Sequence, residues 1–139
     1  MSKLKFGIIG CGRISAKHVD AIINNKDEAE LIAVYDIVKE LAIDRKNQYE
    51  SKIKNSNVKV YANYDEFLND KNIDVVTIAS ISGYHANQAV DSLNRDKHVL
   101  IEKPMALSIE DADRIIRLGK EKNKKVCVAY QNRFNPPIQ

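Results

Sequence analysis

The sequence has few of the features that mark secreted, membrane or nucleic-acid-binding proteins. It has no tryptophan, and aromatic residues make up only 6% of the chain. Its lysine clusters therefore lack the interleaved aromatics of a nucleic-acid-binding surface and indicate solvated faces. The apolar run at residues 6–9 is too short for a signal-peptide core, and no run approaches the roughly 18–20 residues of a membrane helix. We expect a cytoplasmic protein with no nucleic-acid or membrane partner.

Cysteine is equally scarce. Cys11 and Cys127 are the two cysteines of the chain, they lie far apart, and neither belongs to a C-x-x-C motif. This pattern favours reduced thiols over a disulfide framework or a zinc site, and no metal site is predicted. We interpret Cys11 as a small space-filling residue. Cys127 alternates with Val126 and Val128 in a strand pattern, which predicts a core position.

The remaining sequence alternates between two patterns. With 44% apolar and 29% charged residues, 139 residues suit one domain with a real core. Short segments rich in Val and Ile predict strands at 4–9, 31–35, 58–61, 75–79, 98–101 and 125–130. Helical patterns cover 14–23, 36–52, 65–68, 84–93 and 109–118, the last with Ser108 as a predicted N-cap. We predict an α/β fold: a doubly wound, Rossmann-like, parallel six-stranded sheet in the order 3-2-1-4-5-6.

The first strand ends abruptly in a glycine turn that resembles a dinucleotide phosphate site. The pattern is G-x-G-x-x-G, with Gly10 and Gly12 in the first two positions and Ser15 in the third. Gly10 permits the tight turn and Gly12 lets the backbone approach a pyrophosphate. The amides of Arg13 and Ile14 then open the helix and face the anion. A purely structural strand–turn–helix is the alternative.

Asp36 closes the second predicted strand, 21 positions after Ser15. A carboxylate there accepts hydrogen bonds from the adenosine ribose hydroxyls and repels a 2′-phosphate. Ile37 follows, with no adjacent arginine to hold that phosphate. The pattern therefore predicts NAD as the cofactor and disfavours NADP. Asp36 is also a candidate N-cap for the next helix, and the two roles are compatible.

Three motifs together resemble the Gfo/Idh/MocA family of NAD(P)-dependent oxidoreductases. Glu102-Lys103-Pro104 ends the fifth predicted strand, the glycine turn is followed by His18, and the chain closes with Gln-Asn-Arg-Phe-Asn-Pro at 131–136. The resemblance spans the whole chain. It implies oxidation or reduction of an alcohol or carbonyl centre on a sugar, cyclitol or nucleotide sugar.

The resemblance makes Lys103 the lysine that lies between nicotinamide and substrate. At the carboxyl end of a strand, its ammonium can bond the reacting hydroxyl and stabilise oxyanion character as hydride leaves. Glu102 is expected to orient this loop or bond the cofactor. Pro104 fixes the following backbone and is a candidate for a cis peptide bond. We expect His18, on the core-leaning face of the first helix, to be structural.

The turn after the fourth predicted strand departs from the family pattern. Family members usually carry Pro-Asn and then His here, and this chain has Ile81 and Ser82 before the matching His85. Ser80 and Ser82 remain candidates for hydrogen bonds to cofactor ribose or phosphate. His85 is either a cofactor contact or a cap or packing residue. By resemblance, Asn132 and Arg133 reach cofactor or substrate.

The family pattern also suggests how the chain divides. Residues 1–131 are expected to form the NAD-binding domain, and 132–139 to begin a connection to a substrate and oligomerisation domain. In the family that second domain supplies an Asp and a His for acid–base chemistry. We therefore expect a fragment that binds cofactor with little or no turnover, from an intact homo-oligomer. A non-catalytic dinucleotide sensor or co-regulator, and a nucleotide-free Rossmann scaffold, are the alternatives; the presence of Lys103 favours the enzyme.

Overall fold

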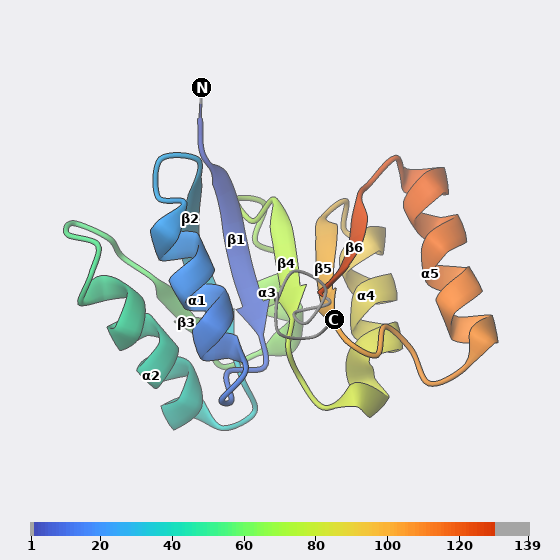
Figure 1. Cartoon of the computed structure of the whole chain (residues 1–139), viewed down its shortest axis with the longest axis horizontal. Helices are drawn as coiled ribbons and strands as arrows, with labels where there is room; N and C mark the ends of the chain where they lie inside the picture. The colour runs from blue at the N-terminus through green and yellow to red at the C-terminus, as the bar shows by residue number, and fades with distance from the viewer. Residues whose placement is uncertain (1, 130–139) are drawn as a thin grey trace, which may run out of the picture.

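Six parallel strands form the sheet in the computed structural model, which describes residues 2–129 (Figure 1). Their order, β3-β2-β1-β4-β5-β6, confirms the predicted doubly wound topology. The strands are β1 (Leu4–Ile9), β2 (Ala29–Tyr35), β3 (Lys59–Tyr61), β4 (Val75–Ile78), β5 (His98–Glu102) and β6 (Val126–Ala129). Each lies within about two residues of its predicted boundaries, because buried Val- and Ile-rich segments and their turn signals define strands well.

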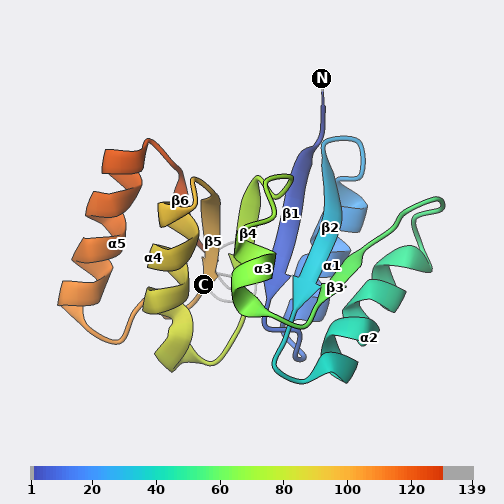
Figure 2. The ribbon, with the colours of Figure 1, turned by 180° about the vertical axis from the view of Figure 1, so that it is seen from behind.

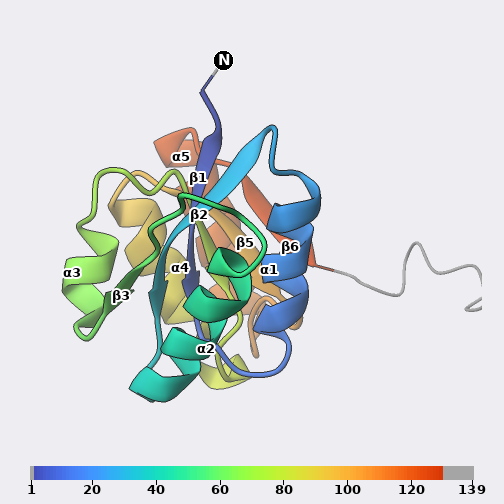
Figure 3. The same cartoon turned by 90° about the vertical axis from the view of Figure 1, so that its left-hand side faces the viewer.

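The helices cover both faces of this sheet. They are α1 (Ser15–Asn24), α2 (Lys39–Glu50), α3 (Tyr64–Leu68), α4 (His85–Asn94) and α5 (Ile109–Lys122), with a short 3₁₀ turn η1 (Ser82–Tyr84) before α4. Figure 2 shows α3, α4 and α5 in front of the sheet, and the edge-on view of Figure 3 places α1 and α2 on the other side. This arrangement gives the three layers that a parallel sheet with helical crossovers requires.

The core consists of two apolar clusters, one on each face of the sheet. Neighbouring residues of β1 show the division: Ile8 packs in the cluster under α1 and α2, and Ile9 in the cluster under α3, α4 and α5. Alternate side chains of a strand point to opposite faces, so a strand covered on both sides is apolar throughout. The four residues of β4 are accordingly all buried.

Helix boundaries follow the local capping chemistry. Ser108 accepts a hydrogen bond from the backbone N–H of Asp111 (3.1 Å), which confirms the predicted N-cap of α5. The helix after β2 begins later than predicted, at Lys39. Its N-cap is Val38, so the N-cap role considered for Asp36 is wrong. The Asp36 carboxylate instead accepts from the N–H of Val38 (2.7 Å), closing a turn that delays the helix.

The prediction that Cys127 belongs to the core is also wrong, because its side chain is exposed. It lies in β6, at the edge of the sheet. Val126 packs against the cluster under α4 and α5, so the next residue points to the opposite face. In the described part of the chain, α1 and α2 cover that face only beside the other half of the sheet (Figure 1). The alternation in the sequence correctly predicted that side chains of β6 point to both faces of the sheet. It did not predict which of these faces the helices cover.

None of the helices between residues 2 and 129 combines the length and apolar character needed to cross a bilayer. The same residues contain no group of three or more His, Cys, Asp or Glu side chains placed to share a metal ion.

Candidate functional site

The predicted site residues within the described chain gather at one edge of the sheet. Gly10, Asp36, Ser80 and Lys103 each follow a different parallel strand at its carboxyl end. Carboxyl ends of parallel strands meet at one edge, and in doubly wound folds ligands bind there. Backbone hydrogen bonds join these turns: the N–H of Gly10 donates to the carbonyl of Tyr35 at 2.9 Å. Residues far apart in sequence therefore share one site.

Gly10 and Gly12 have different structural roles in the first turn. Gly10 has φ +87°, and a Cβ there would lie 2.4 Å from the backbone nitrogen of Ser80. Only glycine fits this conformation and this close approach. At Gly12 a Cβ would meet no atom within 4 Å. The chain therefore leaves open space above Gly12, which is what a bound pyrophosphate needs.

Helix α1 begins directly after this turn. Ser15 is fully buried, and its hydroxyl donates to the carbonyl of Gly12 at 2.5 Å, so a small side chain here lets the helix approach the sheet. Arg13 and Ile14 precede it in the first turn, where helices leave backbone N–H groups without intrahelical acceptors. Those N–H groups and the helix dipole favour an anion at this position. The geometry fits a dinucleotide phosphate.

Asp36 links the glycine turn to the end of β2. One carboxylate oxygen accepts from the N–H of Cys11 and the other from that of Val38, both at 2.7 Å. An ionised carboxylate has about four acceptor positions, so these two bonds fix its orientation and leave acceptors for ribose hydroxyls. The sequence had not indicated the bond to Cys11, because it joins residues 25 positions apart.

Cys11 itself is fully buried between the turn and β2. Its thiol donates to the carbonyl of Tyr35 at 3.5 Å. Burial, with a further contribution from the charge of Asp36, raises the pKa of this thiol to about 12. A thiol in this state is a poor nucleophile, which supports the space-filling interpretation.

Lys103, the residue directly after β5, faces solvent. Lys103 is exposed and, with Pro104, Met105 and Ala106, lines a cavity of about 520 Å³. The Lys103–Pro104 peptide bond is cis, as the sequence suggested. Lys103 is thus presented at the carboxyl edge of the sheet, the edge at which the glycine turn also lies, and it borders an open cavity.

Glu102 and His18 hold the base of this loop. The Nε2 atom of His18 in α1 lies 2.6 Å from Oε1 of Glu102, and the two side chains are 11% and 8% exposed. The structural role expected for His18 is therefore a contact with Glu102, the last residue of β5, which directly precedes Lys103. The sequence did not indicate Glu102 as the partner of His18. It placed His18 on the core-leaning face of the first helix and Glu102 at a strand end, but it did not pair residues 84 positions apart.

The turn after β4 brings its polar residues to the same edge. The Ser80 hydroxyl donates to Oε1 of Gln88 (2.5 Å), and Ser82 begins η1 and is partly exposed. His85 is 1% exposed at the start of α4, and its two ring nitrogens lie against backbone carbonyls, of Pro104 at 2.8 Å and of Ser80 at 2.7 Å. Asn132 and Arg133 lie outside the described residues.

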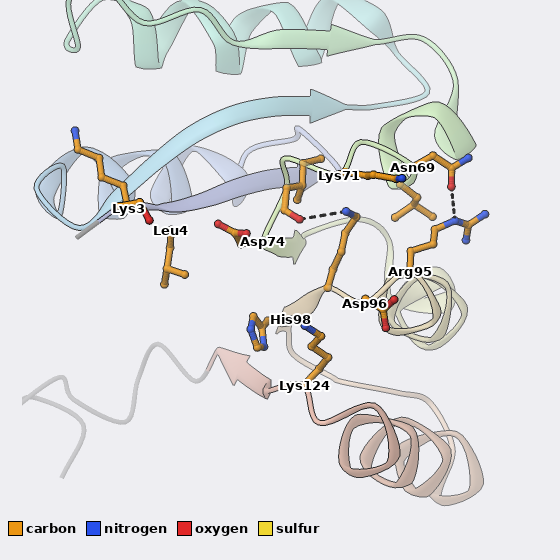
Figure 4. A pocket seen from close by; sticks show the side chains of 13 residues that line it. Lys3, Leu4, Asn69, Lys71, Asp74, Arg95, Asp96, His98 and Lys124 are labelled. Carbon is orange, nitrogen blue, oxygen red and sulfur yellow. Dashed lines mark hydrogen bonds between the residues drawn. The ribbon is translucent and has the colours of Figure 1, made fainter.

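A second cavity, of about 570 Å³, lies at the opposite end of the sheet (Figure 4). Its lining includes Leu4, Asp74 and His98, at or beside the strand starts, and Lys97. Lys97 is buried and donates to the carbonyls of Asp70 (2.7 Å) and Ile73 (3.1 Å). Burial lowers the pKa of Lys97. These bonds give Lys97 a structural role, and the position at the amino ends of the strands separates this cavity from the cofactor edge.

Comparison with known proteins places this geometry in a family. Residues 4–130 match the family described as an oxidoreductase family with an NAD-binding Rossmann fold, Gfo/Idh/MocA. The chain belongs to this family. The matched range contains all six strands. It also contains two of the motifs that carry the resemblance, the glycine turn and Glu102-Lys103-Pro104.

Individual Gfo/Idh/MocA proteins agree with this assignment. Inositol 2-dehydrogenase of Salmonella typhimurium is 33% identical over 133 residues, covering 95% of this chain and 38% of the relative. The WlbA dehydrogenase from Bordetella pertussis, solved with NADH and UDP-GlcNAcA, superposes with a TM-score of 0.85 at 32% identity, over 97% of this chain and 39% of that one. The myo-inositol dehydrogenase from Lactobacillus casei, solved with NAD(H) and myo-inositol, gives 0.84 at 32% identity, with the same coverage. The chain therefore spans well under half the length of these relatives.

Proposed function

We propose that this chain is the NAD-binding part of an oxidoreductase that transfers hydride between a nicotinamide cofactor and a hydroxyl or carbonyl carbon of a sugar, cyclitol or nucleotide sugar. The observation that carries the proposal is the position of Lys103, which lines an open cavity at the same sheet edge as the glycine turn. The substrate class follows the relatives, which act on inositol or were solved with a UDP-sugar.

The cofactor side of the proposal rests on the first two turns. Bound NAD would supply the hydride acceptor. The N–H groups of Arg13 and Ile14 hold its pyrophosphate above Gly12, where a Cβ would meet open space. Asp36, oriented by two backbone N–H groups, accepts from the adenosine ribose. Ser80, Ser82 and Glu102 border the same edge and complete the proposed cofactor contacts.

The chemical side of the proposal assigns Lys103 the reacting hydroxyl. Its ammonium donates a hydrogen bond to that oxygen and stabilises the negative charge that grows on it as hydride leaves carbon. Asn132 and Arg133 are proposed to help bind substrate. Residues 1–131 form the cofactor domain and 132–139 lead toward a second domain that supplies the remaining acid–base groups, so the chain alone binds cofactor without sustained turnover.

We further propose that the intact protein is a cytoplasmic homo-oligomer. Two free cysteines, one buried and one exposed, suit a reducing compartment. Light scattering of the intact protein measures the oligomeric state directly, and a monomer would contradict that part of the proposal.

The proposed chemistry is tested in the intact protein by NADH formation with myo-inositol and with UDP-sugars. Lys103→Ala should abolish turnover and leave NAD affinity unchanged, because the side chain contributes to the transition state more than to cofactor binding. Lys71→Ala, an exposed lysine at the opposite end of the sheet, is the control and should leave turnover unchanged. Turnover retained by Lys103→Ala would remove this residue from the mechanism.

A further inference from the structure

His85 connects the two loops on which the proposed site depends. Its side chain is 1% exposed, at the first residue of α4. One ring nitrogen, Nδ1, lies 2.8 Å from the carbonyl oxygen of Pro104, in the residue after Lys103. The other, Nε2, lies 2.7 Å from the carbonyl oxygen of Ser80. A single buried ring therefore touches the backbone of both the β4 turn and the lysine loop.

The partners define what the ring must do. Carbonyl oxygens only accept hydrogen bonds, and a neutral imidazole carries one N–H. A hydrogen bond to either carbonyl therefore needs the N–H on the ring nitrogen that faces it. With the proton on Nδ1 the ring donates to the Pro104 carbonyl, and with the proton on Nε2 it donates to the Ser80 carbonyl.

The two carbonyl groups that His85 contacts belong to residues that lie next to Gly10 and to Lys103. The backbone of Ser80 packs directly against Gly10, at 2.4 Å from the position of a Cβ there. Pro104 follows Lys103 through the cis bond. The ring consequently ties the loop that carries the lysine to the strand end that supports the phosphate turn.

We propose that His85 is a positioning residue: its Nδ1–H holds the Pro104 carbonyl and so fixes Lys103 relative to the glycine turn. The inference rests on the function proposed for Lys103. It assigns His85 an effect on turnover without direct contact with cofactor or substrate, since both ring nitrogens face the protein backbone.

Two substitutions of His85 distinguish its hydrogen bond to Pro104 from its hydrogen bond to Ser80. The amide nitrogen of Asn reaches the place of Nδ1, and that of Gln the place of Nε2. His85→Asn therefore keeps a donor for Pro104, and His85→Gln keeps one for Ser80. In the intact protein we expect His85→Gln to lower kcat by about 10- to 100-fold, the scale of a loop misplaced by about an ångström. His85→Asn should keep most of kcat, and both variants should keep the NAD dissociation constant. His98→Gln, at the far end of β5, is the control and should leave both constants unchanged.

Equal kcat in the two His85 variants, whether both high or both low, overturns the proposal, as does failure of both to fold. A loss of NAD affinity that parallels the loss of kcat would instead make His85 a cofactor contact and also overturns it. Crystal structures of the two variants separate this inference from the proposed function. If the Pro104 carbonyl is displaced in His85→Gln but not in His85→Asn, the structures support the hydrogen bond from His85 to Pro104. If Lys103→Ala retains turnover at the same time, the role proposed for Lys103 is contradicted and the role of His85 in holding the loop is not.

Discussion

Nε2 of His18 lies 2.6 Å from Oε1 of Glu102, across 84 residues of sequence. This contact joins the helix behind the glycine turn to the strand residue next to Lys103. Both side chains are about nine-tenths buried. The contact thereby connects the phosphate side of the proposed site directly to its lysine side.

The contact should contribute measurably to stability. His18→Leu keeps an apolar body but removes the hydrogen bond between His18 and the buried Glu102, and the loss of such a bond costs about 1–3 kcal/mol. Urea unfolding of the chain measures this. Asp96→Asn is the control because it removes only the exposed ion pair with Lys122, at 3.8 Å, and should change stability by about 0.5 kcal/mol or less. Equal effects of the two substitutions would show that the His18–Glu102 contact adds nothing.

The two glycines of the first turn should respond differently to alanine. Gly10→Ala forces a Cβ against the backbone of Ser80 at a positive φ, so we expect poor folding or a loss of several kcal/mol. Gly12→Ala places its Cβ in open space and should leave stability within about 1 kcal/mol. The same methyl group would occupy the approach of a pyrophosphate, so NAD affinity should fall.

Thermal unfolding and NAD titration of both variants check this pair. If Gly12→Ala bound NAD as well as the parent chain, the pyrophosphate would not lie above Gly12.

The two cysteines should differ sharply toward alkylation. The pKa of Cys11, raised to about 12, leaves roughly one thiolate in a thousand at pH 9, whereas a thiol with the ordinary value of 9.0 is half ionised there. Raising the pH to 9 therefore should not activate Cys11. We expect iodoacetamide to modify exposed Cys127 in the folded chain and Cys11 only after unfolding, as mass spectrometry of Cys11→Ser and Cys127→Ser would show. Rapid labelling of Cys11 in the folded chain would contradict its buried position.

Glu50 should make stability depend on pH in the acid range. Hydrogen bonds from the N–H of Val58 (2.8 Å) and from the ammonium of Lys46 (2.9 Å) lower the pKa of Glu50. A group whose folded pKa is depressed stabilises the fold above its unfolded pKa, and the contribution is lost as pH falls through the folded pKa. Glu50→Gln should therefore destabilise the chain more at pH 7 than at pH 3 in urea unfolding. The same loss at both pH values would mean that the carboxylate charge is not involved.

The sequence predicted the sheet and its order because most of the strands are short apolar segments, rich in Val and Ile, that alternate with helical patterns. It also placed Gly10, Asp36 and Lys103 at strand ends, and parallel topology then brings those ends together. The prediction that Cys127 is buried failed, because alternation along a strand does not tell which face of an edge strand the helices cover. The sequence did not indicate the contacts of Asp36 with Cys11 and of His18 with Glu102, because side-chain partners distant in sequence depend on how the helices pack.

The central claim is that the glycine turn and Asp36 form an NAD site, and calorimetric titration of the chain with NAD and NADP tests it most directly. Because the carboxylate of Asp36 is fixed beside the turn and repels a 2′-phosphate, NAD should bind tighter than NADP by about tenfold or more, or at least about 1.4 kcal/mol. Equal or tighter binding of NADP would contradict the role of Asp36, and binding of neither dinucleotide would contradict the site itself.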